Sequence, residues 1–182
     1  MDRGARYFAQ PVGGADDSMD GPGWGYLEGG DIFVLGKTIL VGHSGHCSNP
    51  EGARWLQHVL GESYRVEIVN LESSCFQHLD CVLCTPREGV AIACTEAFVD
   101  GLPEIIRDWD IIGVSKELCN DHLGTNHLVL DDQTIVVPAE AAHDGVTAEL
   151  QKRNFEVIRL PYEAVYRMGG SFRCAHQPLI RI

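Results

Sequence analysis

The feature that most constrains the fold is an order of elements that occurs three times along the chain of 182 residues. In each stretch an apolar strand, a polar turn, a second apolar strand, a helix and a third strand follow one another. The period is about 45 residues, in the range where repeats indicate a modular array. We therefore predict α/β modules of ββαβ order over about 27–71, 78–115 and 126–161, with a partial fourth over 165–182.

Local signals place the elements inside these modules. Asn49-Pro50-Glu51 combines a helix N-cap, a proline suited to the first turn and an acid near the positive end of a helix. This pattern predicts a helix over 50–60. The remaining predictions are strands over 31–36, 38–42, 64–71, 78–84, 90–94, 110–114, 127–130, 134–138 and 155–160, helices near 103–109 and 143–153, an opening strand over 173–182, and a loop or disordered lead-in over 1–25 before a single domain over 26–182.

The composition limits the partners and the compartment. The chain carries 26 Asp and Glu against 14 Lys and Arg, a formal net charge of −12, which disfavours nucleic acid and anionic membranes because both need basic surface. The N-terminal sequence lacks the apolar region of a signal peptide, and no apolar run approaches membrane-spanning length. The chain has seven cysteines, an odd number, and most of them lie in apolar runs. This pattern indicates free thiols in a reducing compartment, so we expect a cytoplasmic protein.

A cysteine near the end of the chain is a candidate nucleophile. Cys174 follows the pair Gly169-Gly170, and glycines adopt backbone angles that other residues avoid and let a ligand approach the main chain. A thiol in such a place becomes reactive when a neighbour lowers its pKa or accepts its proton. A lone cysteine is more often a buried structural thiol, so the interpretation depends on its partners.

Two further groups stand where modules begin. Alternation on the predicted strand over 78–84 places His78 and Asp80 on one face, which suits a general acid or base beside a carboxylate. The Glu-Gly-Gly-Asp segment puts Glu28 and Asp31 where glycines admit a ligand close to the backbone, so both are candidate substrate-binding residues. Each pattern alone also fits solvated turn residues. Equivalent strand starts converge on one centre in a rotationally symmetric array, so together the groups predict a single site.

A zinc site is the competing interpretation of one segment. Cys75-x2-His78-x2-Cys81-x2-Cys84 offers four soft ligands. Three-residue spacing suits a loop, however, and alternation on the predicted strand turns Cys81 away from His78 and Cys84. We therefore expect neither a metal nor another cofactor.

The order of these motifs resembles the guanidine-modifying, or pentein, superfamily, which includes arginine deiminases, dimethylarginine dimethylaminohydrolases and glycine or inosamine amidinotransferases. The shared signatures are Glu28–Asp31, His78–Asp80 and the terminal Gly-Gly with Cys174. The intervening sequence is similar to the amidinotransferase branch in Asn49-x2-Gly52-x2-Trp55-Leu56, Tyr64-Arg65-Val66, Trp109-Asp110-Ile111-Ile112 and Asn126-x-Leu128-Val129-Leu130-Asp131.

The resemblance implies a pentein-type α/β propeller of ββαβ modules around a central site, incomplete at the N-terminus of this chain. It implies Cys174 as the nucleophile, His78 as the general acid and base, and Glu28 and Asp80 as carboxylates that hold a substrate guanidinium. The activity implied is that of an amidinotransferase, which moves an amidino group from a small guanidine such as arginine to an amine through an amidino-cysteine intermediate.

Two departures from the family pattern leave alternatives open. Relatives have five modules and an N-terminal Arg-Asp motif that has no counterpart here. His46 stands where deiminase-like relatives often have an arginine for the substrate carboxylate, with Arg87 and Arg173 as candidate substitutes. A guanidine hydrolase of the arginine deiminase or dimethylargininase type is therefore one alternative, and an inactive homologue kept for binding or assembly is another. Open sheet edges also favour a homo-oligomer or a complementing N-terminal segment.

Overall fold

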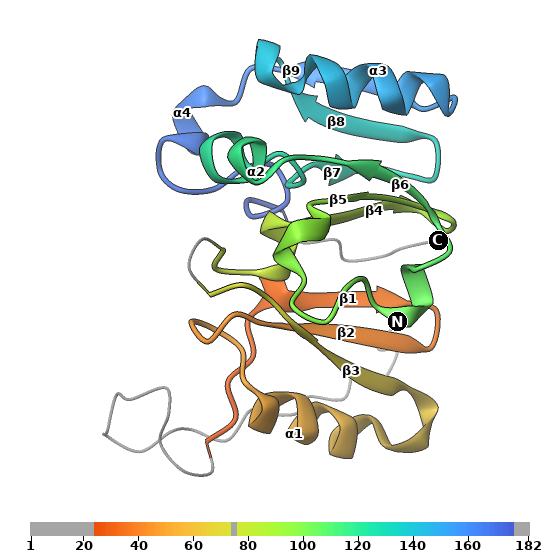
Figure 1. Cartoon of the computed structure of the whole chain (residues 1–182), viewed down its shortest axis with the longest axis vertical. Coiled ribbons are helices and arrows are strands. Elements are labelled where there is room, and N and C mark those ends of the chain that lie inside the picture. The colour runs from red at the N-terminus through yellow and green to blue at the C-terminus, as the bar shows by residue number, and fades with distance from the viewer. Residues whose placement is uncertain (1–23, 74–75, 177–182) are drawn as a thin grey trace, which may run out of the picture.

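Three sheets of three strands each are stacked along the long axis of the molecule (Figure 1). The computed structural model describes residues 24–73 and 76–176. Within each sheet the strands follow the order of the sequence, the first pair being antiparallel and the second pair parallel. A tight turn joins the antiparallel pair, whereas the parallel pair needs a crossover. The predicted repetition of α/β modules is confirmed, with an α-helix in the crossover of the first and third modules.

The first module follows its local signals closely. The Oδ1 atom of Asn49 accepts a hydrogen bond from the Gly52 N–H at 2.9 Å, and Pro50 occupies the first helical turn, so the helix begins where the sequence predicts. Asn49 also accepts from the Tyr26 N–H and donates to the Trp24 carbonyl, which ties the preceding segment to the helix. The elements are β1 (Ile32–Leu35), β2 (Thr38–His43), α1 (Pro50–Leu60) and β3 (Arg65–Asn70).

The second module departs from prediction at two places. The strand predicted over 78–84 is wrong in its first half, where a one-turn 3-10 helix, η3 (Leu79–Cys81), precedes the strand. The helix predicted near 103–109 is also wrong, because only a 3-10 turn forms before the Asp110 N–H bonds to the Gly89 carbonyl at 2.9 Å and the chain enters the next strand. The elements are β4 (Leu83–Arg87), β5 (Val90–Ala93) and β6 (Asp110–Gly113).

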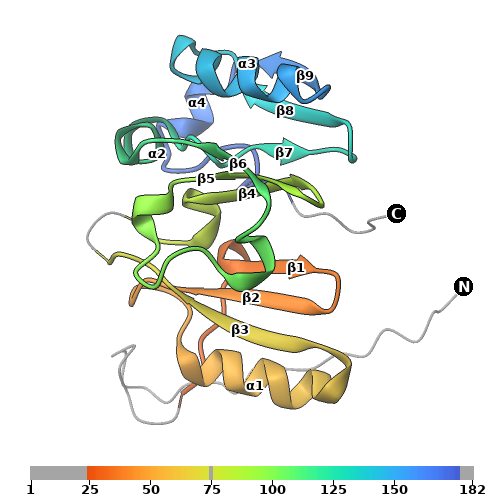
Figure 2. The same cartoon turned by 45° about the vertical axis from the view of Figure 1, so that its right-hand side comes forward.

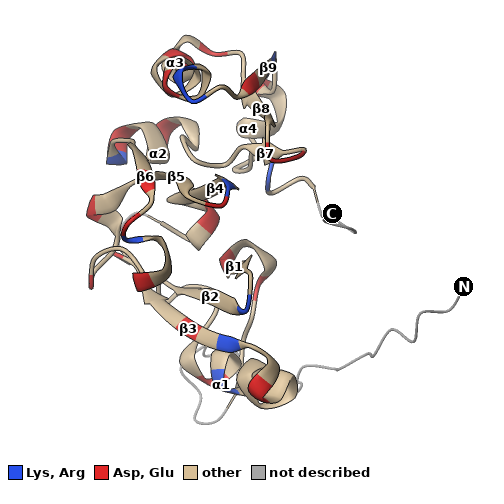
Figure 3. Ribbon diagram, turned by 90° about the vertical axis from the view of Figure 1, so that its right-hand side faces the viewer, with Lys and Arg blue, Asp and Glu red and all other residues tan. Residues whose placement is uncertain are grey.

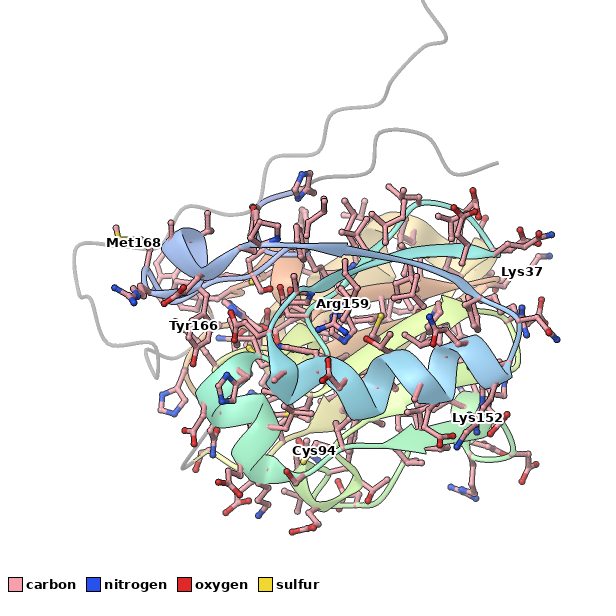
Figure 4. The ribbon with its side chains drawn as sticks, turned by 90° about the horizontal axis from the view of Figure 1, so that it is seen from above. Lys37, Cys94, Lys152, Arg159, Tyr166 and Met168 are labelled. Carbon is pink, nitrogen blue, oxygen red and sulfur yellow. The ribbon has the colours of Figure 1, made fainter. Side chains whose placement is uncertain are left out.

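A helix that the sequence patterns missed links the second module to the third. The hydroxyl of Ser115 accepts from the Leu118 N–H at 3.1 Å and caps α2 (Lys116–His122). In the third module, Arg159 lies between its own strand and the helix that precedes this strand (Figure 4), where it donates to Asp144 and Thr147. The remaining elements are β7 (Leu128–Val129), β8 (Thr134–Pro138), α3 (Asp144–Lys152), β9 (Glu156–Leu160) and α4 (Glu163–Tyr166).

The middle sheet lies between the other two and is buried on both sides (Figure 2). Strand β5 contributes side chains to both faces of this sheet, because alternate residues of a strand face opposite sides. Ala91 and Ala93 pack into a hydrophobic cluster with the first module, and Val90 and Ile92 pack into a cluster with the third. Burial of both faces joins neighbouring modules through shared cores.

The described residues include only part of the segments predicted at the two ends of the chain. Most of the predicted lead-in over 1–25 and of the predicted strand over 173–182 lies outside them; residues 172–175 form a turn. Acidic residues are spread over all three modules (Figure 3). Among the described helices, none has the length and apolar character needed to cross a membrane.

Candidate active site

Two equivalent turns present the first pair of candidate residues. Glu28 and His78 are the N-caps of the 3-10 helices η1 (Gly29–Asp31) and η3, and both have extended backbone angles. Each turn precedes the first strand of its module. The Nε2 atom of His78 lies 2.7 Å from Oε2 of Glu28. The strand geometry predicted for His78 is wrong, but the predicted convergence of module starts is present.

A glycine makes room for the histidine ring. A Cβ atom at Gly30 would lie 2.8 Å from Cγ and 3.1 Å from Nδ1 of His78, closer than real Cβ contacts. At the neighbouring Gly29, an added Cβ would meet nothing within 4 Å. The second glycine of the Glu-Gly-Gly-Asp segment is therefore required for the position of His78, and the first is not.

Asp80 is a buried carboxylate held inside the site. Its side chain is 3% exposed, and its Oδ2 atom lies 3.5 Å from Nε of Arg173. Burial raises the pKa of Asp80, and the positive charges of Arg173 and His78 oppose that shift. The backbone carbonyl of Asp80 accepts from the Thr125 hydroxyl and from Nδ2 of Asn126, which anchors the turn to the third module.

The same asparagine positions the candidate nucleophile. Asn126 accepts the Cys174 N–H on Oδ1 at 3.1 Å, and its backbone carbonyl accepts the Arg173 N–H. Cys174 is exposed, and a Cβ at Gly170 would come within 3.3 Å of its Cβ. Burial of the sulfur environment and the nearby Asp80 carboxylate raise the pKa of the Cys174 thiol. Both influences favour the protonated form of the thiol.

These residues share one pocket of about 780 Å³. Glu28, His78, Asp80 and Cys174 all line it, so four of the five predicted site residues come together. The third module adds His127, which the sequence analysis did not single out. Asn126 was missed as a site residue, and Arg173 was predicted only as a candidate partner for a substrate carboxylate, because the contacts of both join distant segments. The other lining residues are Gly29, Gly30, Ile32, Phe33, Val34, Cys84, Thr85, Leu128, Val129, Arg173 and His176.

Asp31 lies apart from the pocket lining, in contrast to its predicted contact with substrate. It is 0% exposed, and its two oxygens accept the N–H groups of Leu79 and Ser48 at 2.9 and 3.2 Å. Burial raises its pKa, and these hydrogen bonds oppose the shift. Its carboxylate therefore joins the first two modules, because Ser48 belongs to the first and Leu79 to the second.

The ligands considered for zinc do not form one group in the part of the chain that the structure describes. Cys75 lies outside that part, and Cys84 packs in a hydrophobic cluster with Ile92 and Ile135. Potential ligand atoms do approach within 4.8 Å of one another in two other sets, Glu28 with Cys47 and His78, and His78 with Asp80 and Cys81. Both sets contain His78 and therefore coincide with the candidate active site.

The fold and this pocket define the chain as a member of the pentein superfamily. Within it, the chain belongs to the family described as N,N dimethylarginine dimethylhydrolase, eukaryotic, whose sequence model matches residues 17–181. The predicted superfamily is thereby confirmed.

Individual relatives include transferases and hydrolases. The L-arginine:L-lysine amidinotransferase of Pseudomonas savastanoi pv. phaseolicola is 29% identical over 158 residues, 82% of this chain and 42% of that protein. The structure of SxtG, an amidinotransferase of Microseira wollei, matches with a TM-score of 0.69 and 27% identity over 84% of this chain and 47% of its own. The DDAH of Pseudomonas aeruginosa in complex with citrulline has a TM-score of 0.67 and 23% identity, over 80% of this chain and 53% of its own, a likeness of fold. The chain spans about half the length of the curated relatives it matches.

Proposed function

We propose that this chain carries the active site of a guanidine-modifying enzyme in which Cys174 is the nucleophile. The observation that supports this most is the convergence of Cys174, His78, Glu28 and Asp80 on one pocket, although they belong to separate segments. A nucleophile, a proton carrier and two acids are the groups that substitution at a guanidinium carbon requires.

The two acids give the pocket its preference for a cation. A planar guanidinium donates paired hydrogen bonds to carboxylates, and these are stronger than neutral hydrogen bonds. Asp80 is buried and Glu28 is half exposed, so a guanidinium between them would leave its alkyl group toward solvent. We propose Asp80 as the main partner of the substrate cation, while Glu28 orients His78 and contacts the substrate from the other side.

Binding of the cation prepares the nucleophile. The pKa of the Cys174 thiol is raised partly by the Asp80 carboxylate. A guanidinium beside Asp80 offsets that negative charge and so favours the thiolate. In our proposal His78 accepts the thiol proton, and the sulfur then forms a bond with the guanidinium carbon. The carbon–nitrogen bond to the leaving amine breaks, the amine takes the proton from His78, and an amidino-thioether remains on Cys174.

The second half of the reaction decides the class of enzyme. With an amine as the incoming nucleophile, His78 removes its proton, the amidino group moves to the amine and the thiol is restored. We propose this transfer reaction because amidinotransferases are among the relatives with 27% and 29% identity. Hydrolysis by water is the second candidate, because the matching family model is described as a dimethylhydrolase.

Product analysis separates these possibilities. The protein is incubated with L-arginine, with and without candidate amines such as L-lysine, and ornithine, citrulline and ammonia are measured. Ornithine that appears only with an amine supports transfer, whereas citrulline with ammonia supports hydrolysis by a deiminase reaction. N,N-dimethylarginine is tested in parallel for release of dimethylamine.

A second experiment tests the nucleophile. We expect Cys174→Ala to form none of these products, and we expect mass spectrometry to detect the amidino adduct on Cys174 in the unmodified chain. Turnover that persists in Cys174→Ala contradicts the mechanism, and no product from any guanidine favours a binding or assembly role.

We further propose that additional polypeptide packs against the open side of the module array. Val34 on β1 and Leu130 after β7 are 55% and 53% exposed, although both belong to first-strand regions beside the pocket. A second copy of this chain or a complementing N-terminal segment would cover them. Sedimentation analysis of the chain, alone and with an added N-terminal portion, tests this.

We also propose a reducing, cytoplasmic compartment, which the free thiols Cys47, Cys81, Cys94 and Cys119 support.

A further inference from the structure

The side chain before the nucleophile is itself a guanidinium inside the pocket. Arg173 lines the same pocket as Asp80 and Cys174, and its side chain is only 20% exposed. Its Nε atom lies 3.5 Å from Oδ2 of Asp80. Its NH2 group donates to the carbonyl of Ile32 at 3.1 Å, and its guanidinium carbon lies 4.2 Å from the centre of the Phe33 ring.

These contacts are the ones that a substrate guanidinium would use. A carboxylate, a backbone carbonyl and an aromatic face together form a complete environment for a planar cation. They come from two modules, with Ile32 and Phe33 on β1 and Asp80 on η3. Because Asp80 is buried, one guanidinium beside it excludes a second from the same carboxylate edge.

We propose that Arg173 is an internal guanidinium that occupies the Asp80 subsite and must be displaced before a substrate guanidinium can bind there. This inference rests on the proposed function, since it takes Asp80 as the partner of the substrate cation. It assigns Arg173 as a positioning and specificity residue that competes with substrate.

The pairing is suited to displacement. Among the described residues, the buried Nε of Arg173 has no hydrogen-bond partner, so its contact with Asp80 is an ion pair without a paired hydrogen bond. A substrate that forms two parallel N–H···O bonds with the carboxylate therefore binds better than the internal side chain. Arg173 can leave without carrying Cys174 away, because the Cys174 backbone N–H is held separately by Asn126.

A binding experiment with two ligands tests the inference. Each protein carries Cys174→Ala so that no reaction follows binding. Calorimetry then measures the dissociation constants of methylguanidine, which has no carboxylate, and of L-arginine. Arg173→Met keeps most of the apolar stem and removes the guanidinium that lies over Phe33, and Arg173→Lys keeps the charge without the planar group. Arg167→Met is the matched control, because Arg167 is 74% exposed and pairs with Glu163 outside the pocket.

Competition predicts that both ligands bind about tenfold or more tightly to Arg173→Met, because the free subsite is then fully populated. Arg173→Lys gives a smaller increase, and Arg167→Met gives none. Unchanged or weaker binding of methylguanidine in both Arg173 variants overturns the inference but leaves the proposed function intact. Weaker arginine binding with unchanged methylguanidine binding overturns it too, since Arg173 would then receive a carboxylate. If neither ligand binds to any variant, the proposed function fails as well.

Thermal unfolding verifies that each variant is folded. If Arg173→Met does not fold, the binding measured with Arg173→Lys decides the outcome.

Discussion

The Nε2 atom of His78 lies 2.7 Å from Oε2 of Glu28, and this hydrogen bond crosses from the first module to the second inside the candidate active site. The contact engages Nε2 of His78, while Nδ1 lies on the side of the ring that faces Gly30. In the proposed mechanism it also gives Glu28 a role that the sequence patterns did not assign, because a carboxylate expected to hold substrate would also orient His78 as the proton carrier. Three substitutions separate the catalytic contributions of this region from its structural ones.

Glu28→Gln tests the orientation of His78. We expect kcat to fall about 10²-fold, because a misdirected general acid and base loses most of its contribution. The free energy of unfolding should change by less than about 1 kcal/mol, because the Glu28 side chain is 53% exposed and exposed ion pairs stabilise little. Product assays and urea denaturation measure the two quantities. Glu51→Gln, which breaks an exposed pair with Arg54, is the control. A normal kcat in Glu28→Gln would remove the orienting role.

Gly30→Ala tests the space in which His78 lies. The added methyl group would lie 2.8 Å from the ring and push it away from Glu28, so we expect kcat to fall about tenfold or more, as misplaced catalytic groups do. Gly29→Ala is a close control, because its methyl group meets nothing within 4 Å. Equal activity in the two variants would show that the position of the ring is not critical.

Asp31→Asn tests the structural role assigned to the buried carboxylate. Asparagine keeps one acceptor but turns an NH2 group toward the Leu79 or Ser48 N–H, so the free energy of unfolding should fall by about 2 kcal/mol. The KM for guanidines should stay unchanged because Asp31 does not line the pocket. Urea denaturation and steady-state kinetics provide the two measurements, with the exposed Asp108→Asn as control. A large rise in KM at normal stability would restore the substrate-binding role predicted from the sequence.

Two buried histidines predict a loss of stability in acid. Burial lowers the pKa of His127 to about 3 and also lowers that of His143, whose ring centroid lies 5.4 Å away. Below pH 6.5 the unfolded chain binds protons that the folded chain does not. Stability is therefore complete above pH 6.5 and falls as the pH drops toward 3, by at most about 1.4 kcal/mol per pH unit for each histidine.

Urea denaturation between pH 7 and pH 4 checks this dependence. His143→Phe should flatten the slope because it removes one of the two groups. His58→Phe, at an exposed position on α1, should leave the slope unchanged. An identical slope in His143→Phe and in the unmodified chain would contradict the assignment.

The sequence predicts those parts of the fold that local signals specify. The N-cap at Asn49 and the strand over 134–138 are examples. The turn at His78 was taken for a strand because it is set by a distant contact, the Leu79 N–H to Asp31. The helix after Ser115 carries few apolar residues and offered no periodic pattern. His143 begins the helix predicted over 143–153, and it is fully buried with the rings of His122 and His127 beside it, contacts that the sequence does not show.

The residues of the candidate site also fall into those that the sequence predicts and those whose contacts it does not show. Glu28, His78, Asp80 and Cys174 could be found together because they occupy related places in a repeat, which is visible in the sequence. The contacts of Asn126 and Arg173 could not, since each joins segments that only the folded chain brings together.

Through Asn126, the surroundings of the Cys174 thiol depend on correct docking of the second and third modules. One residue of the third module binds both the turn that carries Asp80 and the segment that carries Cys174. The sulfur therefore meets its acid and its proton carrier only after the second and third modules have docked. Under the proposed function, a chain whose modules have not docked carries an ordinary cysteine, and we expect a nascent or damaged copy not to modify guanidines before it has acquired its native structure.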